Sequence, residues 1–141
     1  MKEQLKLENQ LCFPLYVCAK EVIRKYTPLL KPFDMTYTQY ITMMAMWEHK
    51  SLTVNKMSKL LFLDSGTLTP MLKKMEKKNW IKRERSKDDE RNVIIRITEE
   101  GESLQERLAN VPNEMLQCLV IDKSDAQQLY LILNKILTKL K

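Results

Sequence analysis

Residues 63–76 read LDSGTLTPMLKKME, and they carry the strongest structural signal in the chain. The triplet Asp-Ser-Gly at 64–66 is a turn signal, and apolar residues at helical spacing follow it to about Asn79. A short helix to about Leu60 precedes the turn, because Thr53 is a favoured helix cap. Four apolar residues of this short helix are expected to face inward: Val54, Met57, Leu60 and Leu61. Two short helices joined by a tight turn that contains glycine are typical of a helix-turn-helix.

The period of the pattern changes to two after Asn79. Residues 80–85 (WIKRER) and 93–97 (VIIRI) therefore predict two strands. The loop between them, residues 86–92, is too charged to be buried. A helix-turn-helix followed by a charged β-hairpin is a winged helix.

A long helix is predicted before this core, from residue 9 or 10 to Leu30. Pro14 restricts where that helix begins, because proline is tolerated in a first turn but clashes in a helix interior. This restriction places Cys12 within the first turn of the helix.

The remaining helices are predicted from their caps and prolines. Thr36 is the expected cap of a helix that ends near Glu48. Thr98 opens a long helix, since threonine is a good cap and the acidic residues after it favour the positive end of the helix dipole. Pro112 kinks or divides that helix, and a last helix covers about residues 124–140.

Together these elements predict a mainly α protein with a small β-hairpin, in which a winged helix-turn-helix is embedded in a helical homodimer. We expect a single domain over residues 1–141. Its winged helix-turn-helix core covers about 36–98, and its dimerisation helices cover about 7–32 and 99–141. The terminal helices are too apolar to stand alone in water, so a second copy should cover them.

Positive charge is concentrated in one part of the chain. The formal net charge is +6, and residues 73–96 alone carry ten basic and five acidic side chains, a net charge of +5. A basic block of this kind is typical of a surface that binds a polyanion. A solvated helix and hairpin with no such partner is the alternative for this feature taken alone.

Composition also excludes several classes of protein. No apolar run approaches the roughly 20 residues that span a bilayer, and the N-terminus lacks a signal-peptide core, so we expect a cytoplasmic protein with no membrane partner. The three cysteines should be thiols in a reducing compartment. With no Cys-x-x-Cys pair and a single histidine, His49, neither a metal site nor a cofactor is expected.

These segments resemble the MarR family of bacterial regulators. The resemblance lies in residues 52–54 and 63–76, and in an Asp-x-Arg wing motif within residues 85–91. A narrower similarity, to the organic hydroperoxide resistance regulators, is carried by the segment LENQLCF at 7–13 together with Tyr16, Tyr26, Tyr37 and Trp47–His49. The similarity runs from about Leu7 to Pro112. It implies a DNA-binding repressor that senses oxidants and is not an enzyme.

The fold and the resemblance together imply how double-stranded DNA is read. The helix after the turn enters the major groove and presents Ser65, Thr67, Thr69, Lys73 and Lys74. The resemblance implies that Arg91 reaches the minor groove and that Asp89 orients the wing loop. Phosphates are expected to be tracked by Lys82, Arg83, Arg85 and Lys87. A two-fold dimer predicts a pseudo-palindromic operator with half-sites about 10 base pairs apart, or a multiple of that. Alternatively, the hydroxyl groups of Ser65, Thr67 and Thr69 do not read bases and serve only to cap the helix.

Cys12 is the candidate redox sensor. In a first helical turn, free backbone N–H groups and the positive end of the helix dipole favour its thiolate. Tyr26 lies fourteen residues further along the same helix, about 21 Å away at about 1.5 Å per residue. Tyr26 can therefore serve Cys12 only from the other subunit, with the two first helices antiparallel. The resemblance implies the same arrangement, with Tyr37 and Tyr16 in the sensor pocket. An isolated cysteine on a helix is otherwise usually a small apolar core residue.

The role of a second cysteine follows from the resemblance. Cys118 follows Cys12 by 106 residues, about where two-cysteine relatives carry a resolving cysteine that forms an intersubunit disulfide. In one-cysteine relatives a small thiol caps the sensor instead. Cys18 faces another side of the helix and is expected in the core. Oxidation of Cys12 to a sulfenic acid and then to a disulfide would respace the two winged helices and release the operator. The oxidant stays open among organic hydroperoxides, hydrogen peroxide and hypochlorite.

Three other functions stay open at this point. A regulator of the same fold could respond to a small ligand in the dimer crevice, with structural cysteines. A thiol peroxidase would turn over peroxide at Cys12, although the basic recognition segment and the missing peroxidase scaffold argue against an enzyme. A nonspecific architectural protein would bind unrelated duplexes equally well.

Overall fold

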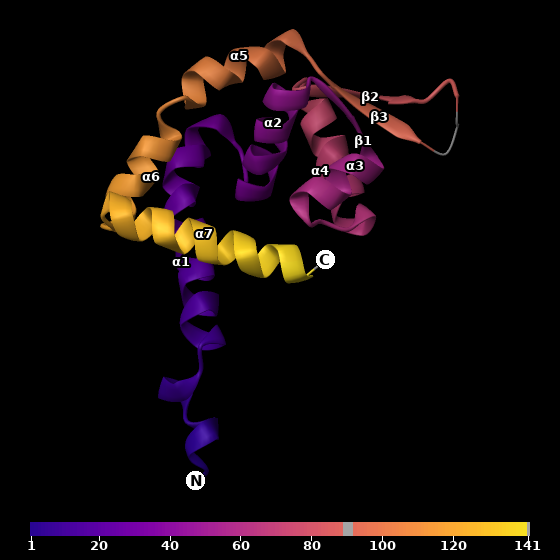
Figure 1. Cartoon of the computed structure of the whole chain (residues 1–141). Coiled ribbons are helices and arrows are strands. Elements are labelled where there is room, and N and C mark those ends of the chain that lie inside the picture. The colour runs from indigo at the N-terminus through magenta and orange to yellow at the C-terminus, as the bar shows by residue number, and fades with distance from the viewer. Residues whose placement is uncertain (89–91, 141) are drawn as a thin grey trace. The chain divides into compact units, whose positions relative to one another are not determined.

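A computed structural model describes residues 1–88 and 92–140 (Figure 1). The chain forms two compact units, Met1–Ala109 and Asn110–Lys141. The first unit holds the winged helix and the long N-terminal helix, and the second holds the last two helices. The mainly α fold class with a β-hairpin is confirmed.

The predicted helix-turn-helix is present in the first unit. It consists of α3 (Val54–Leu61) and α4 (Ser65–Lys77), and it is preceded by α2 (Tyr37–His49). Thr36 caps α2 in a capping box with Gln39, and the Thr53 side chain accepts a hydrogen bond from the backbone N–H of Lys56. These side chains satisfy backbone N–H groups that the first turn of a helix leaves unpaired. The two caps expected from the sequence are therefore confirmed.

The wing is part of a three-stranded antiparallel sheet. Its strands are β1 (Ser51–Thr53), β2 (Ile81–Arg85) and β3 (Val93–Ile97), in the order β1-β3-β2. Ile81 pairs with Ile97 at the base of the hairpin, and β2 and β3 extend away from the helices of this unit (Figure 1). The sequence predicted β2 and β3 but missed β1. Three residues between two helices have no pattern of their own, and β1 exists because it pairs with β3.

The core of the first unit is rich in methionine and leucine. Most of its fully buried side chains come from α2, α3, α4 and the sheet, with one each from α1 (Cys12–Leu30) and α5 (Glu99–Leu108): Met43, Met46, Met57, Leu68, Leu72, Met75, Ile81, Ile95, Leu30 and Leu108. Leu60 was expected to face inward, but it is 47% exposed. The periodicity of α3 was identified correctly, but periodicity does not show how far neighbouring elements extend over a helical face.

The N-terminal helix α1 (Cys12–Leu30) begins two or three residues later than expected, after short 3-10 turns at Glu3–Leu5 and Leu7–Asn9. Cys12 is its first residue and Pro14 its third, where the missing N–H costs no intrahelical hydrogen bond. A further 3-10 turn, η3 (Lys31–Phe33), leads into α2. Leu30 is buried, whereas many other apolar residues of α1 are exposed: Phe13, Leu15, Tyr16 and Ile23.

The prediction that Cys18 is a core residue is wrong for the described chain, in which Cys18 is exposed. Cys18 lies in the N-terminal half of α1, whereas the buried residue of this helix, Leu30, is its last. Spacing along a helix shows that two residues occupy different faces, but it does not show which face another element covers.

Pro112 divides the C-terminal helical region, as the sequence predicted. Helix α5 (Glu99–Leu108) ends the first unit, and α6 (Val111–Leu119) begins the second with Pro112 in its first turn. The last helix is α7 (Lys123–Leu140). None of the helices in residues 1–88 and 92–140 is long and apolar enough to cross a membrane.

Candidate functional site

Helix α4 presents one apolar and one polar face. Leu68, Met71, Leu72 and Met75 are buried. At about 100° per residue, the direction opposite this stripe is occupied by Gly66, Pro70, Lys73 and Lys77, with Thr69 and Lys74 at its two edges. All six of these residues are exposed. This outward face includes Thr69, Lys73 and Lys74 from the predicted reading residues.

The N-terminus of α4 is organised by Asp64. Its carboxylate accepts the hydroxyl of Thr67 at 2.7 Å and the backbone N–H of Thr67 at 3.2 Å. The hydroxyl bond is the main reason why the pKa of Asp64 is lowered. The Thr67 hydroxyl thus serves as part of the cap, which was the alternative for this residue, while Ser65 is exposed beside it.

The lysines of α4 differ in their surroundings. All three lysines are exposed on the polar side of α4, but Lys74 and Lys77 also line a hollow beside Thr36 and Gln39 at the start of α2, whereas Lys73 does not. The sequence had singled out Lys73 and Lys74 and had counted Lys77 only as part of the basic block. The helical wheel of α4 could have identified Lys77, because its angle is close to that of Lys73.

The basic residues of the wing differ in how far they are exposed to solvent. The guanidinium of Arg83 is held by Glu76 of α4, with Nε and Nη2 each 3.1 Å from Oε1. The backbone N–H of Arg83 also donates to Glu76, and this bond is the main cause of the lowered pKa of that carboxyl. Arg83 therefore anchors the wing to α4. Lys82, Arg85 and Lys87 are exposed, and the predicted residues Asp89 and Arg91 lie outside the described residues.

The predicted thiol site is distributed over both units. Cys12 is a free, exposed thiol at the start of α1. Cys118 is also a free, exposed thiol, in α6 of the second unit. Tyr16 is exposed on α1, with Lys20 Nζ 5.5 Å from the centre of its ring.

Tyr26 and Tyr37 are brought together at the other end of α1. Their ring centres are 4.7 Å apart, and the ring of Tyr40 lies 5.8 Å from that of Tyr26. Burial raises the pKa of Tyr26 and of Tyr37. The sequence predicted Tyr26 and Tyr37 as residues of the sensor pocket but did not single out Tyr40. The spacing of three residues between Tyr37 and Tyr40 places them on one face of α2, and this spacing could have identified Tyr40 as a member of the cluster.

The tyrosine cluster predicts that the free energy of unfolding decreases at alkaline pH. Burial raises the pKa of Tyr40 to about 12, with smaller contributions from Tyr26 and Tyr37. An unfolded tyrosine loses its proton near pH 10, whereas folded Tyr40 keeps it to about pH 12, so stability should fall as pH rises through this window. Urea unfolding from about pH 9 to about pH 11 should show a smaller decline for Tyr40→Phe. Parallel declines for wild type and variant would contradict this expectation.

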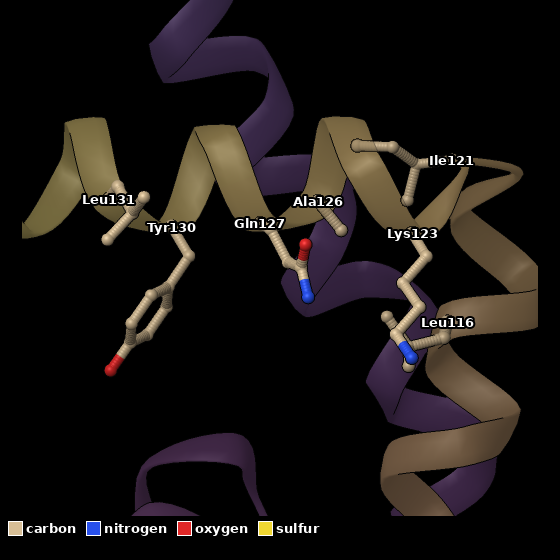
Figure 2. Close-up of a pocket in the computed structure, with 7 residues that line it drawn as sticks. All are labelled: Leu116, Ile121, Lys123, Ala126, Gln127, Tyr130 and Leu131. Carbon is tan, nitrogen blue, oxygen red and sulfur yellow. The ribbon is translucent and has the colours of Figure 1, made fainter.

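The second unit carries an apolar groove of about 690 Å³ between α6 and α7 (Figure 2). Leu116 of α6 lines it, and Gln127 and Tyr130 project from one side of α7. Many other apolar side chains of this unit are exposed: Leu119, Val120, Leu129, Leu131, Ile132, Ile136, Leu137 and Leu140. An apolar surface of this extent is typical of a protein–protein interface.

A capped recognition helix followed by a basic wing defines a winged-helix DNA-binding protein. Residues 24–108 match the family model described as transcriptional regulator SarA/Rot. The chain belongs to this family of transcriptional regulators, a class that is not enzymatic. The chain is also 47% identical, over 127 residues, to the organic hydroperoxide resistance transcriptional regulator of Bacillus subtilis, covering 90% of this chain and 86% of that protein.

Solved structures extend the similarity to the whole chain. The structure of reduced AbfR bound to DNA has a TM-score of 0.81 at 37% identity and covers 99% of this chain and 96% of that one. The structure of disulfide-formed AbfR has a TM-score of 0.67 at 36% identity, with coverage of 96% and 95%. AbfR is a protein of Staphylococcus epidermidis. The predicted resemblance to MarR-family redox regulators is confirmed.

Proposed function

We propose that this regulator is a homodimeric repressor that senses oxidants through Cys12 and releases its operator when Cys12 is oxidised. The observation that carries the proposal is the contact between Tyr26 and Tyr37, with ring centres 4.7 Å apart. The two phenol side chains lie near the C-terminal end of α1, whereas Cys12 is at its N-terminal end. Phenol hydroxyls are hydrogen-bond donors that stabilise a thiolate.

The cluster can serve Cys12 only across a dimer. Cys12 and Tyr26 lie on the same helix, α1, fourteen positions apart, which corresponds to about 21 Å. Two antiparallel copies of α1 would bring the Cys12 of one protomer to the tyrosines of the other. The exposed apolar residues of α1 and the groove of the second unit support such a dimer, since both would otherwise face water.

The position of Cys12 also suits the chemistry. As the first residue of α1 it is a free, exposed thiol that a hydroperoxide can reach. Its thiolate attacks the hydroxyl oxygen of a hydroperoxide, so that an S–O bond forms, the O–O bond breaks and an alkoxide leaves. The alkoxide takes up a proton from solvent, equivalent to the one that the thiol released, and departs as an alcohol. The resulting sulfenic acid then condenses with the Cys118 thiol to a disulfide, with loss of water. The existence of a reduced, DNA-bound form and a disulfide form of the similar protein AbfR supports this sequence of states.

The reduced dimer would read a pseudo-palindromic operator with its two α4 helices. Thr69 and Lys73 lie on the outward face of α4, with Ser65 beside its N-terminus. Lys82, Arg85 and Lys87 of the wing would follow phosphates, and Arg91 would reach the minor groove with Asp89 orienting the loop. A disulfide needs Cα atoms within about 7 Å. If Cys12 of one protomer and Cys118 of the other lie further apart than this in the reduced dimer, forming the disulfide moves helices of both protomers and so changes the spacing of the reading helices.

Replacement of Cys12 by serine tests the sensor. Operator affinity is measured by fluorescence anisotropy on a duplex selected by binding from random sequences, before and after treatment with cumene hydroperoxide. Wild type should lose affinity by about tenfold or more on oxidation. Cys12→Ser should lose none, because serine forms no sulfenic acid. Cys18→Ser is the matched control, and it should respond like wild type.

Cys118→Ser separates the two ways of resolving the sulfenic acid. On a non-reducing gel, peroxide should convert wild type to a covalent dimer and leave Cys118→Ser as a monomer. A covalent dimer that persists without Cys118 removes this residue from the mechanism. A full peroxide response in Cys12→Ser would refute the sensor and leave a regulator that responds to another signal.

A further inference from the structure

Tyr40 connects the tyrosine cluster to the interior of the first unit. It is only 2% exposed. On one side its ring lies 5.8 Å from that of Tyr26, and on the other it meets the ring of Trp47 edge-on at 6.5 Å. Tyr40 and Trp47 are two turns apart on α2, so this helix carries aromatic contacts from the cluster toward its own C-terminal end.

Trp47 continues this connection to the root of the wing. We use this term for Trp80, Thr98 and Gly101, which join β2, β3 and α5. The indole Nε1 of Trp47 donates to the carbonyl of Gly101 at 2.8 Å. Gly101 N donates to the hydroxyl of Thr98 at 3.0 Å, and Thr98 N donates to the carbonyl of Trp80 at 3.1 Å. Each step is a direct contact between ordered groups.

The space around Gly101 leaves little room for movement. A Cβ at this position would overlap the carbonyl oxygen of Trp80 and would lie 2.9 Å from Cγ1 of Ile97 at the end of β3. The start of α5 therefore rests directly on the base of the hairpin. A shift of the indole would be transmitted to both strands, because close-packed groups cannot absorb it.

We infer that Tyr40 and Trp47 are positioning residues that link the sensor tyrosines to the root of the wing. Tyr40 holds the ring of Tyr26 in place, and Trp47 passes a displacement of the cluster to Gly101. The inference rests on the proposed function, in which the oxidised sulfur of the partner protomer displaces the tyrosines. It adds a route within each protomer by which the sensor reaches the DNA-binding wing.

Trp47→Phe tests the second half of this link, because phenylalanine keeps an aromatic ring but cannot donate to Gly101. Reduced Trp47→Phe should bind the operator, and its Cys12 should react with cumene hydroperoxide, within about twofold of wild type. Its operator affinity should then fall by less than about threefold on oxidation, against about tenfold or more for wild type. Trp80→Phe is the matched control, since it replaces a buried tryptophan of the wing root and leaves the indole bond to Gly101 intact.

Tyr40 is tested by the rate of Cys12 oxidation. Tyr40→Leu should slow thiol loss by about fivefold or more, because Tyr26 loses the ring that holds it. Tyr40→Phe keeps that ring and should react like wild type. Thermal melts of the reduced proteins check that each variant is folded. Full release by oxidised Trp47→Phe, or an unchanged oxidation rate in Tyr40→Leu, would overturn the inference.

A final measurement separates this inference from the sensor proposal. The chain has two tryptophans, so Trp80→Phe leaves Trp47 as the single fluorophore. Coupling is reciprocal, and operator binding to the reduced protein should therefore change Trp47 emission without any oxidant. Unchanged emission overturns the link. Changed emission supports it even if Cys12→Ser shows that the signal is sensed elsewhere.

Discussion

Replacing Gly101 with alanine is expected to destabilise the protein by about 3 kcal/mol. The direction is the opposite of what the local sequence suggests. Gly101 lies inside the first turn of α5, and alanine is favoured over glycine in a helix by about 1 kcal/mol. The new methyl group would, however, overlap the carbonyl oxygen of Trp80.

The Trp80 carbonyl has little freedom to move aside. It accepts the backbone N–H of Thr98 at 3.1 Å, and Trp80 immediately precedes Ile81, which is fully buried at the start of β2. Relief of the overlap would have to displace α5 from the base of the wing. Forced displacement of packed backbone is costly because the surrounding core is close-packed.

Gly66→Ala is the matched control for this substitution. A Cβ at Gly66 would lie 2.9 Å from Oδ2 of Asp64, the end of an exposed side chain, so its displacement would weaken a capping bond to Thr67 but would move no packed backbone. Urea unfolding at one protomer concentration should show a change of less than about 1 kcal/mol for Gly66→Ala. Equal stability losses in the two variants would contradict the special role of Gly101.

Reversal of charge at Lys73 is expected to have the largest effect on DNA binding. Lys73 lies opposite the buried stripe of α4, on the face proposed to enter the major groove. In a dimer, Lys73→Glu removes two cations from the interface and adds two anions. We expect the affinity for the operator to fall by about a hundredfold near physiological salt, and the slope of log affinity against log salt to decrease by about 2.

The matched control is Lys25→Glu, which makes the same change of charge at an exposed position of α1. It should lower affinity by less than about threefold, because only long-range electrostatics are affected. Circular dichroism and thermal melts should show that both variants are folded. If Lys25→Glu weakened binding as much as Lys73→Glu, net charge rather than the face of α4 would govern affinity.

The helices and strands of this protein follow largely from short-range information. Thr36, Thr53 and Thr98 each cap a helix where the sequence predicted one, because a cap bonds to N–H groups only two or three residues away. Pro112 divides the C-terminal region for an equally local reason, since its ring fits a first turn and not a helix interior. The change of period after Asn79 likewise predicted β2 and β3.

The contacts that give these elements their roles depend on segments far apart in the chain. Strand β1 exists through its pairing with β3. Even the shorter-range contact that makes Arg83 an internal anchor depends on how α4 brings Glu76 to it. Trp47 meets Gly101 across 54 positions of sequence. No periodicity or cap encodes such pairings, because they are set by the path of the folded backbone. The residue types and their spacing therefore predicted a DNA-binding regulator with a sensor thiol. Only the tertiary structure showed that Tyr40, Trp47 and Gly101 contact one another in succession between the tyrosines and the wing.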